Sequence, residues 1–143
     1  IVDVNIKGVI YCMHYQIDAM LKYASAENPC SIVNNSSILS HAAYPGLTVY
    51  SATKHAVSGL TKGAALELAE SNIRVNAVGP GPIRTPMLEV PTDGHPEQFG
   101  GMVPMKRIGE PKEISDAVQW LLSTESSYVT GHTLMIDGGF CSQ

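Results

Sequence analysis

Two short segments, "CSIVNNSS" (residues 30–37) and "SNIRVNAVGPGP" (residues 71–82), decide the fold. Each combines β-branched residues with a boundary of Asn, Ser, Gly or Pro, which is typical of a buried strand. Good helix formers occupy the sequence between them as far as Glu70. A strand, a long helix and a second strand in this order predict a parallel α/β sheet with a right-handed crossover.

The rest of the chain continues this alternation of helix and strand. Apolar residues recur at three- and four-residue spacing from about residue 1 to about residue 24 and predict a helix there: Ile6, Ile10, Met13, Ile17 and Met20. Residues 80–108 carry six prolines and are expected to form a long loop. Pro111 suits the first turn of a further helix, whose expected apolar face is Ile114, Ala117, Val118 and Leu121. The stretch "HTLMIDGG" (residues 132–139) is expected to be the last strand.

The composition narrows the class of protein. With 44% hydrophobic and 15% charged residues it is globular, and a formal net charge of -4 gives no reason to expect nucleic acid or an anionic membrane as a partner. Cys12, Cys30 and Cys141 lack CxxC spacing and the histidines lack metal-ligand spacing, so neither a disulfide framework nor a metal site is predicted. The cysteines make a reducing cytosol, and so a cytoplasmic location, the expectation, and the charge favours a small-molecule ligand. No apolar run approaches the roughly 18 residues that span a bilayer, so a soluble protein is expected.

Tyr50 and Lys54 are four positions apart at the head of the long helix, so their side chains share one face. An ammonium this close favours phenolate over phenol and makes the tyrosine a better proton donor or acceptor near neutral pH. The alternative is a surface pair without function. Ser36 and Ser37 lie at the expected carboxyl end of a strand, where ligands sit in open parallel sheets. His41 follows Ser37 by four positions, but without a GxSxG elbow or an acidic partner a Ser-His hydrolase is disfavoured.

Four motifs follow one another in the sequence: "VNNSS" (residues 33–37), "YSATK" (50–54), "IRVNAVGPGPIRTPM" (73–87) and "GHTLMIDGG" (131–139). In this order and spacing they resemble the classical short-chain dehydrogenase/reductase family over essentially the whole chain. The resemblance implies a Rossmann-like, doubly wound parallel sheet. It also implies an oxidoreductase that interconverts a secondary alcohol and a ketone by hydride transfer with NAD or NADP. The identity of the substrate and the choice between NAD and NADP stay open.

The resemblance further implies roles for individual residues. Tyr50 is the general acid/base, Lys54 assists its ionisation and holds the nicotinamide ribose, and Ser37, thirteen positions before the tyrosine, positions the substrate oxygen. Asn5, within "DVNIKGV", supports a water-linked proton relay. The implied cofactor-binding residues are Tyr50, Lys54, Pro80, Gly81, Ile83 and Thr85. We expect an apolar substrate pocket from residues between Ser37 and Tyr50 and from the start of the long loop: Leu39, Tyr44, Pro45, Leu47, Met87 and Leu88.

A stripe of small residues on the long helix suggests a packing surface. It consists of His55, Gly59 and Gly63 together with Ala52 and Ala56. Small side chains let another helix approach closely. The resemblance implies that this helix and the helix before the strand at residues 30–37 form a subunit interface, so a homodimer or homotetramer is expected. A contact between helices of one molecule is the alternative.

Three motifs of the complete family pattern are not found in the sequence: the Gly-rich TGxxxGxG turn, the charged residue that selects the cofactor, and the NNAG segment. Residues 1–143 are therefore expected to be the carboxyl-terminal half of a single Rossmann-like domain, without its N-terminal cofactor-binding strands. The alternative function is a truncated, non-catalytic oligomerisation module that acts through residues 48–70. Activity of the 143-residue chain by itself is left open.

Overall fold

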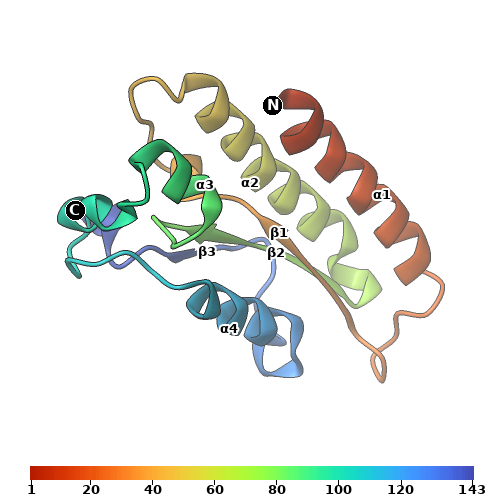
Figure 1. Ribbon diagram of the computed structural model, residues 1–143. Helices are drawn as coiled ribbons and strands as arrows, with labels where there is room; N and C mark the ends of the chain where they lie inside the picture. The colour runs from red at the N-terminus through yellow and green to blue at the C-terminus, as the bar shows by residue number, and fades with distance from the viewer.

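The centre of the molecule is a parallel sheet between two layers of helices (Figure 1). The computed structural model describes residues 1–143, apart from the side chain of Pro91. The described residues form three strands, β1 (Cys30–Asn35), β2 (Ile73–Pro80) and β3 (Thr133–Ile136), paired in the order β1-β2-β3. Both pairings are parallel, so the predicted parallel α/β architecture is confirmed.

Helices α1 (Val9–Met20) and α2 (Thr48–Leu68) lie on one face of the sheet, and α4 (Pro111–Leu122) lies on the other (Figure 1). Helix α2 connects β1 to β2, and α4 precedes β3, as the sequence predicts. Pro111 is the first residue of α4, as expected for a proline whose missing N–H has no partner to lose at that position. The predicted apolar face is also confirmed, because Leu121 is fully buried and Ile114, Ala117 and Val118 are half-buried.

The N-terminal helix is longer than α1 because a π-helix (Asp3–Gly8) precedes it. The sequence predicts the helix but not this wider winding, and α1 ends at Met20 rather than near residue 24. A π-turn takes more residues than an α-turn and so changes which positions face inward. Val9 packs against the core, whereas Ile10, expected on the buried face, is 42% exposed.

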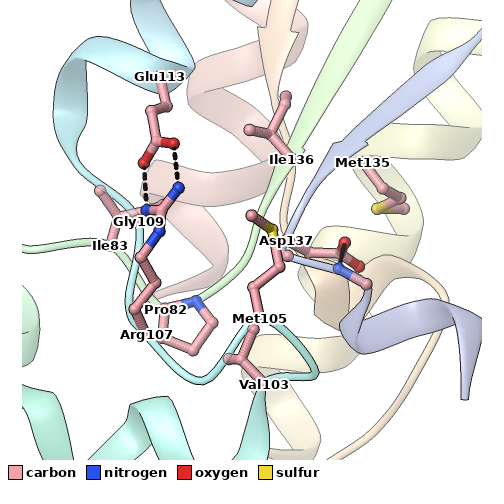
Figure 2. Close-up of a pocket in the computed structure, with 12 residues that line it drawn as sticks. Pro82, Ile83, Val103, Met105, Arg107, Gly109, Glu113, Met135, Ile136 and Asp137 are labelled. Carbon is pink, nitrogen blue, oxygen red and sulfur yellow. Dashed lines mark hydrogen bonds and ion pairs between the residues drawn. The ribbon is translucent and has the colours of Figure 1, made fainter.

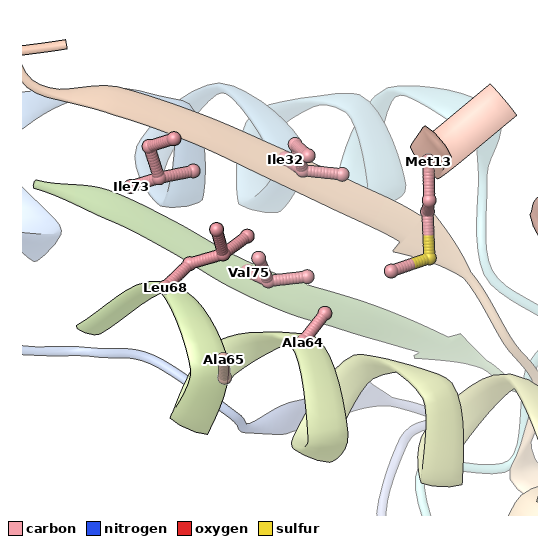
Figure 3. Packing of buried hydrophobic residues seen from close by; sticks show 7 residues of the cluster. All are labelled: Met13, Ile32, Ala64, Ala65, Leu68, Ile73 and Val75. Atoms are coloured by element: carbon pink, nitrogen blue, oxygen red, sulfur yellow. The ribbon is translucent and has the colours of Figure 1, made fainter. Parts of the chain in front are cut away.

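The apolar core lies between α1, α2 and the first two strands (Figure 3). Ala64 and Ala65 let α2 approach β2 closely, and Val75 of β2 is completely buried beneath them. Burying a side chain the size of valine or leucine contributes about 1.5–3 kcal/mol. The buried members of this cluster are Met13, Ile32, Ala64, Ala65, Leu68, Ile73 and Val75.

The long proline-rich segment after β2 contains helical turns of its own. Helix α3 (Pro86–Glu89) is followed by two 3₁₀ segments, Val90–Thr92 and Pro96–Met102. Arg84 holds this segment against the start of α4 by pairing with Glu97 and Glu110. The remaining 3₁₀ segments are Ile38–Ser40, Ala69–Ser71, Thr124–Ser126 and Phe140–Ser142. Among the described helices, none combines the length and the apolar character that crossing a bilayer requires.

Candidate active site

The serine pair lies just beyond the carboxyl end of β1. Ser36 extends the pairing with β2 by one bond, from its backbone N–H to the carbonyl of Val78 at 2.8 Å. Ser37 has an extended backbone and caps the 3₁₀ segment that follows, because its Oγ accepts a hydrogen bond from the Leu39 N–H at 3.2 Å. Both serines are buried, with Ser37 8% exposed.

Tyr50 and Lys54 lie together in the first turns of α2. The Lys54 Nζ is 5.5 Å from the centre of the Tyr50 ring and donates a hydrogen bond to the carbonyl oxygen of Asn35, the last residue of β1, at 3.0 Å. The ammonium is therefore fixed between the tyrosine and the end of the strand. Lys54 is only 9% exposed, and this burial lowers the pKa of its ammonium.

Three buried hydroxyls fix α2 to the sheet beneath this pair. Ser36 Oγ donates to the backbone carbonyl of Lys54 at 3.2 Å and lies 3.3 Å from Ser58 Oγ, which in turn lies 3.1 Å from Thr133 Oγ1. The chain of hydroxyls thus joins the end of β1, helix α2 and the start of β3. It holds the backbone of Lys54 in a fixed position relative to the serine pair.

Asn5 reaches the same helix from the π-helix. Its Nδ2 donates to Thr53 Oγ1 at 3.1 Å, and Thr53 Oγ1 donates to the backbone carbonyl of Tyr50 at 2.7 Å. Local π-helical geometry is often found at functional sites, because it displaces one side chain from the regular helical path. Thr53 was not predicted as part of the site, and its position in the sequence gives no signal of this contact.

The predicted cofactor loop leaves the end of β2 and turns beside the end of β3. A Cβ atom on Gly81 would lie 2.8 Å from the Asp137 Cα, so only glycine fits there. Ile83 forms an isolated bridge with Gly109, and Thr85 Oγ1 donates to the carbonyl of Ile83 at 3.3 Å. All four predicted residues of the loop are half-buried and so border solvent: Pro80, Gly81, Ile83 and Thr85.

A pocket of about 280 Å³ lies on the α4 side of this loop (Figure 2). Arg107 and Glu113 form a two-bond ion pair at its edge, with N–O distances of 2.9 and 2.7 Å. This pairing, together with a bond from the Glu110 N–H, lowers the pKa of Glu113 to about 2. The other residues that line the pocket come from the cofactor loop, residues 103–109 and the end of β3: Pro82, Ile83, Val103, Met105, Gly109, Met135, Ile136, Asp137, Gly138 and Gly139. Ser37, Tyr50 and Lys54 are not among the described residues that line it.

The sequence matches a family model described as enoyl-(acyl carrier protein) reductase over residues 1–141. The chain belongs to the short-chain dehydrogenase/reductase family. It is 38% identical over 143 residues to cyclohexanol dehydrogenase of Acinetobacter sp. (strain SE19), a match that covers 100% of this chain and 54% of that protein. The chain thus spans about half the length of the curated relatives it matches.

Solved structures of the short-chain dehydrogenase/reductase family share the fold. The 3-ketoacyl-(acyl-carrier-protein) reductase from Brucella melitensis, complexed with NADH, has a TM-score of 0.90 and 34% identity over 99% of this chain and 56% of that one. ElxO with NADP bound has a TM-score of 0.87 and 38% identity over 97% of this chain and 56% of that one. The three described strands correspond to part of the Rossmann-like sheet of these longer chains.

The predicted substrate-pocket residues do not share one environment in this family member. Leu39 is buried and Leu88 half-buried, whereas Tyr44 and Leu47 are each 43% exposed and Met87 is 79% exposed. Pro45 is exposed as well. Of these six described residues, none lines the pocket beside the cofactor loop, so their role stays a prediction.

Two alternatives weighed from the sequence can be compared with the geometry. His41 Nδ1 lies 3.1 Å from Ser40 Oγ, and the Ser37 hydroxyl caps its own turn, so the contacts of His41 give no support to a Ser37–His41 pair. The described residues contain no cluster of three or more His, Cys, Asp or Glu side chains that could hold a metal ion. Lys54 lies between Tyr50 and the last residue of β1, and Ser37 follows that residue by two positions.

Proposed function

We propose that the protein containing this chain interconverts a secondary alcohol and a ketone with NAD or NADP, with Tyr50 as general acid/base. The observation that carries the proposal is the fixed position of Lys54, whose Nζ lies 5.5 Å from the Tyr50 ring centre and 3.0 Å from the Asn35 carbonyl. Names of relatives support the reaction class, since one acts as a cyclohexanol dehydrogenase and another as a 3-oxoacyl-[acyl-carrier-protein] reductase.

The proposed proton transfer uses the side chains at the end of β1. In the direction of reduction the Tyr50 hydroxyl donates a proton to the carbonyl oxygen of the substrate, while Ser37 hydrogen-bonds the same oxygen. The positive charge of Lys54 stabilises the phenolate that remains. Asn5 supports this arrangement through Thr53, which bonds the backbone of Tyr50. In the direction of oxidation each step is reversed.

The chain's residues fit the nicotinamide end of the proposed cofactor. An ammonium has three N–H donors, and Lys54 uses one of them on Asn35, so further donors are free for ribose hydroxyls. Pro80, Gly81, Ile83 and Thr85 form the half-buried loop that would lie beside the nicotinamide and the phosphates. When bound, the nicotinamide supplies or accepts the hydride.

The substrate is proposed to be a small molecule bound on an apolar surface. Leu39, Tyr44, Pro45, Leu47, Met87 and Leu88 are the proposed lining. Large exposed apolar side chains such as Leu47 and Met87 support this assignment, because they have surface to lose when a ligand binds. Leu47→Ala and Met87→Ala should change the preference among substrates of different size.

A second copy of the chain is the proposed partner. A groove of about 360 Å³ lies between α1 and α2, bordered by Gly59 and Gly63, and a Cβ on either glycine would meet open space. We propose that this face forms a homodimer or homotetramer interface of a cytoplasmic enzyme whose single domain includes residues 1–143. The same groove favours the alternative function, a non-catalytic oligomerisation module.

Tyr50→Phe distinguishes the two functions, tested in the protein that contains residues 1–143. If the enzyme hypothesis holds, this variant loses turnover of cyclohexanol or of a 3-oxoacyl thioester while its molar mass in solution is unchanged. Tyr15→Phe is the matched control, because Tyr15 is 71% exposed on α1 and should keep full activity. Normal turnover by Tyr50→Phe would rule out the proposed acid/base.

A further inference from the structure

The C-terminal turn, residues 137–141, touches two of the segments that build the candidate active site. We propose that Asp137 is a positioning residue whose carboxylate folds this turn into a clamp between the cofactor loop and the segment after Ser37. The proposal rests on the proposed oxidoreductase function. It gives Asp137 a part in cofactor binding, although its side chain is not among the residues expected to touch cofactor or substrate.

The carboxylate of Asp137 organises the turn directly. Its Oδ1 accepts a hydrogen bond from the Gly139 N–H at 2.9 Å and its Oδ2 accepts one from the Cys141 N–H at 2.8 Å. Burial opposes ionisation of the carboxyl, but these backbone bonds outweigh it and lower the pKa of Asp137. Gly138 and Gly139 have φ values of +60° and +88°, which glycine adopts without strain. The turn is therefore favoured by glycine at both positions and by the two bonds that the Asp137 carboxylate accepts.

The turn sets the position of the cofactor loop by direct contact. The Gly81 N–H donates to the carbonyl of Ile136 at 3.0 Å, immediately before Asp137. Because a Cβ on Gly81 would come within 2.8 Å of the Asp137 Cα, the two backbones are already in close contact. A shift of Asp137 would therefore shift the loop that carries Ile83 and Thr85.

The other end of the turn meets the segment after Ser37. The Cys141 Sγ lies 3.9 Å from the carbonyl oxygen of Ile38, a weak hydrogen bond across 103 positions of the sequence. Ile38 begins the 3₁₀ segment that Ser37 caps. Burial, together with the neighbouring Asp137 carboxylate, raises the pKa of the Cys141 thiol to about 11. The reactivity of the thiol therefore depends both on its burial in the turn and on the Asp137 carboxylate.

A third contact braces the turn from the long segment after β2. The Met105 N–H donates to the carbonyl of Gly138 at 3.2 Å, and a Cβ on Gly138 would lie 2.6 Å from Val103 Cγ1. Figure 2 shows Asp137 at the end of β3, beside Met105. The turn is thus held on several sides, and only the Asp137 carboxylate bonds both its Gly139 and Cys141 amides.

The test compares Asp137→Ala and Asp137→Asn in the protein that contains residues 1–143. Cys12, Cys30 and every cysteine outside residues 1–143 are replaced by serine, so that Cys141 is the thiol that is followed. We measure the dissociation constants for NADH and NADPH, the cofactor KM, kcat and the rate of Cys141 modification. We expect Asp137→Ala to raise the cofactor dissociation constant and KM about fivefold or more, because the cofactor loop shifts with the turn. Modification should also speed up about tenfold or more, because loss of the carboxylate and loss of burial both lower the pKa of the thiol. Asp137→Asn keeps one acceptor and should change both less.

The matched control is Asp116→Asn, an exposed carboxylate on α4 that pairs only with Lys112 among the described residues and should change neither readout. A role limited to stability would reduce the amount of active protein, lowering apparent kcat with the cofactor KM unchanged, and this result would overturn the proposal. Unchanged Cys141 modification in Asp137→Ala, or in Asp137→Asn if the alanine variant does not fold, would also overturn it. Failure of the oxidoreductase function is recognised separately, as absence of turnover and cofactor binding in the parent protein with Asp137 intact.

Discussion

Removing the Ser58 hydroxyl should destabilise the fold, because one neighbour in the buried hydroxyl chain loses its hydrogen-bond partner. Among the described residues, Thr133 Oγ1 has its side-chain hydrogen bond with Ser58, whereas Ser36 also bonds the carbonyl of Lys54. Ser58→Ala therefore leaves Thr133, which is 6% exposed, with an unsatisfied hydroxyl. Such a group costs about 1–3 kcal/mol. Alanine recovers about 0.5 kcal/mol through its higher helix propensity, so we expect a net loss of about 0.5–2.5 kcal/mol.

The assay is urea unfolding followed by the fluorescence of Trp120, the single tryptophan of the sequence. Ser115→Ala in α4 is the matched control, since the Ser115 hydroxyl is exposed and bonds only the carbonyl of Lys112. It shares the gain in helix propensity and should stay within about 0.5 kcal/mol of the parent.

The decisive variant adds Thr133→Val to Ser58→Ala. Removing the second hydroxyl removes the unsatisfied group, so the double variant should be less destabilised than the sum of the two single variants, by about 0.5 kcal/mol or more. Strict additivity, or a Ser58→Ala variant as stable as Ser115→Ala, would refute the view that the hydroxyls act as one connected chain.

Two predictions concern titration. Burial lowers the pKa of Lys54 below the ordinary 10.5, so its charge is lost below that pH and turnover should begin to fall there. Lys54→Arg should move the fall in turnover to higher pH. A turnover profile that is flat to pH 10.5 would contradict a role for the charge of Lys54. Glu113 has its pKa lowered from 4.5 to about 2, so its contribution to stability is fully present above pH 4.5 and is lost as pH falls towards 2. Glu113→Gln should therefore flatten the change in urea midpoint across that interval, and an unchanged slope would count against the Arg107 pairing.

Local sequence patterns predict the strands and the long helices because each of these elements carries its own signal. The β-branched runs at residues 30–37 and 71–82 are recognisable without their partners, and Pro111 marks a helix start by its own chemistry. The π-helix at residues 3–8 has no such mark. Helix α3 and the 3₁₀ segments after it were not predicted, because the prolines in this segment indicate a loop. Tertiary contacts such as Arg84–Glu97, which hold the segment in place, do not follow from local sequence.

The site is predictable only in part for a related reason. The spacing of Tyr50 and Lys54 guarantees a shared helix face, whatever the rest of the molecule does. The contact of Asn5 with Thr53 spans 48 positions, and that of Cys141 with Ile38 spans 103, so neither follows from local spacing. The substrate-pocket residues are hardest to predict, because their exposure depends on loops rather than on the periodicity of one element.

Helix α2 divides into two halves with different tasks. Towards its carboxyl end the sheet-facing residues are apolar and belong to the core of Figure 3: Ala64, Ala65 and Leu68. Towards its amino end the buried positions are polar except for Val57: Ser51, Thr53, Lys54, Ser58 and Thr61. Polar burial is costly, and the Ser51 hydroxyl is buried with no hydrogen-bond partner among the described residues.

The two halves of α2 depend on each other. A helix is stiff over the three turns that separate Lys54 from Ala65, so apolar packing at one end fixes the position of polar groups at the other. Desolvation of Lys54 disfavours its charge, and the core offsets that cost while the hydroxyl chain keeps the ammonium aimed between Tyr50 and β1. Large-to-small changes at Leu68 should therefore lower stability and also loosen the position of Lys54. Changes at Ser36 or Ser58 act more directly, through the hydroxyl chain that bonds the backbone of Lys54.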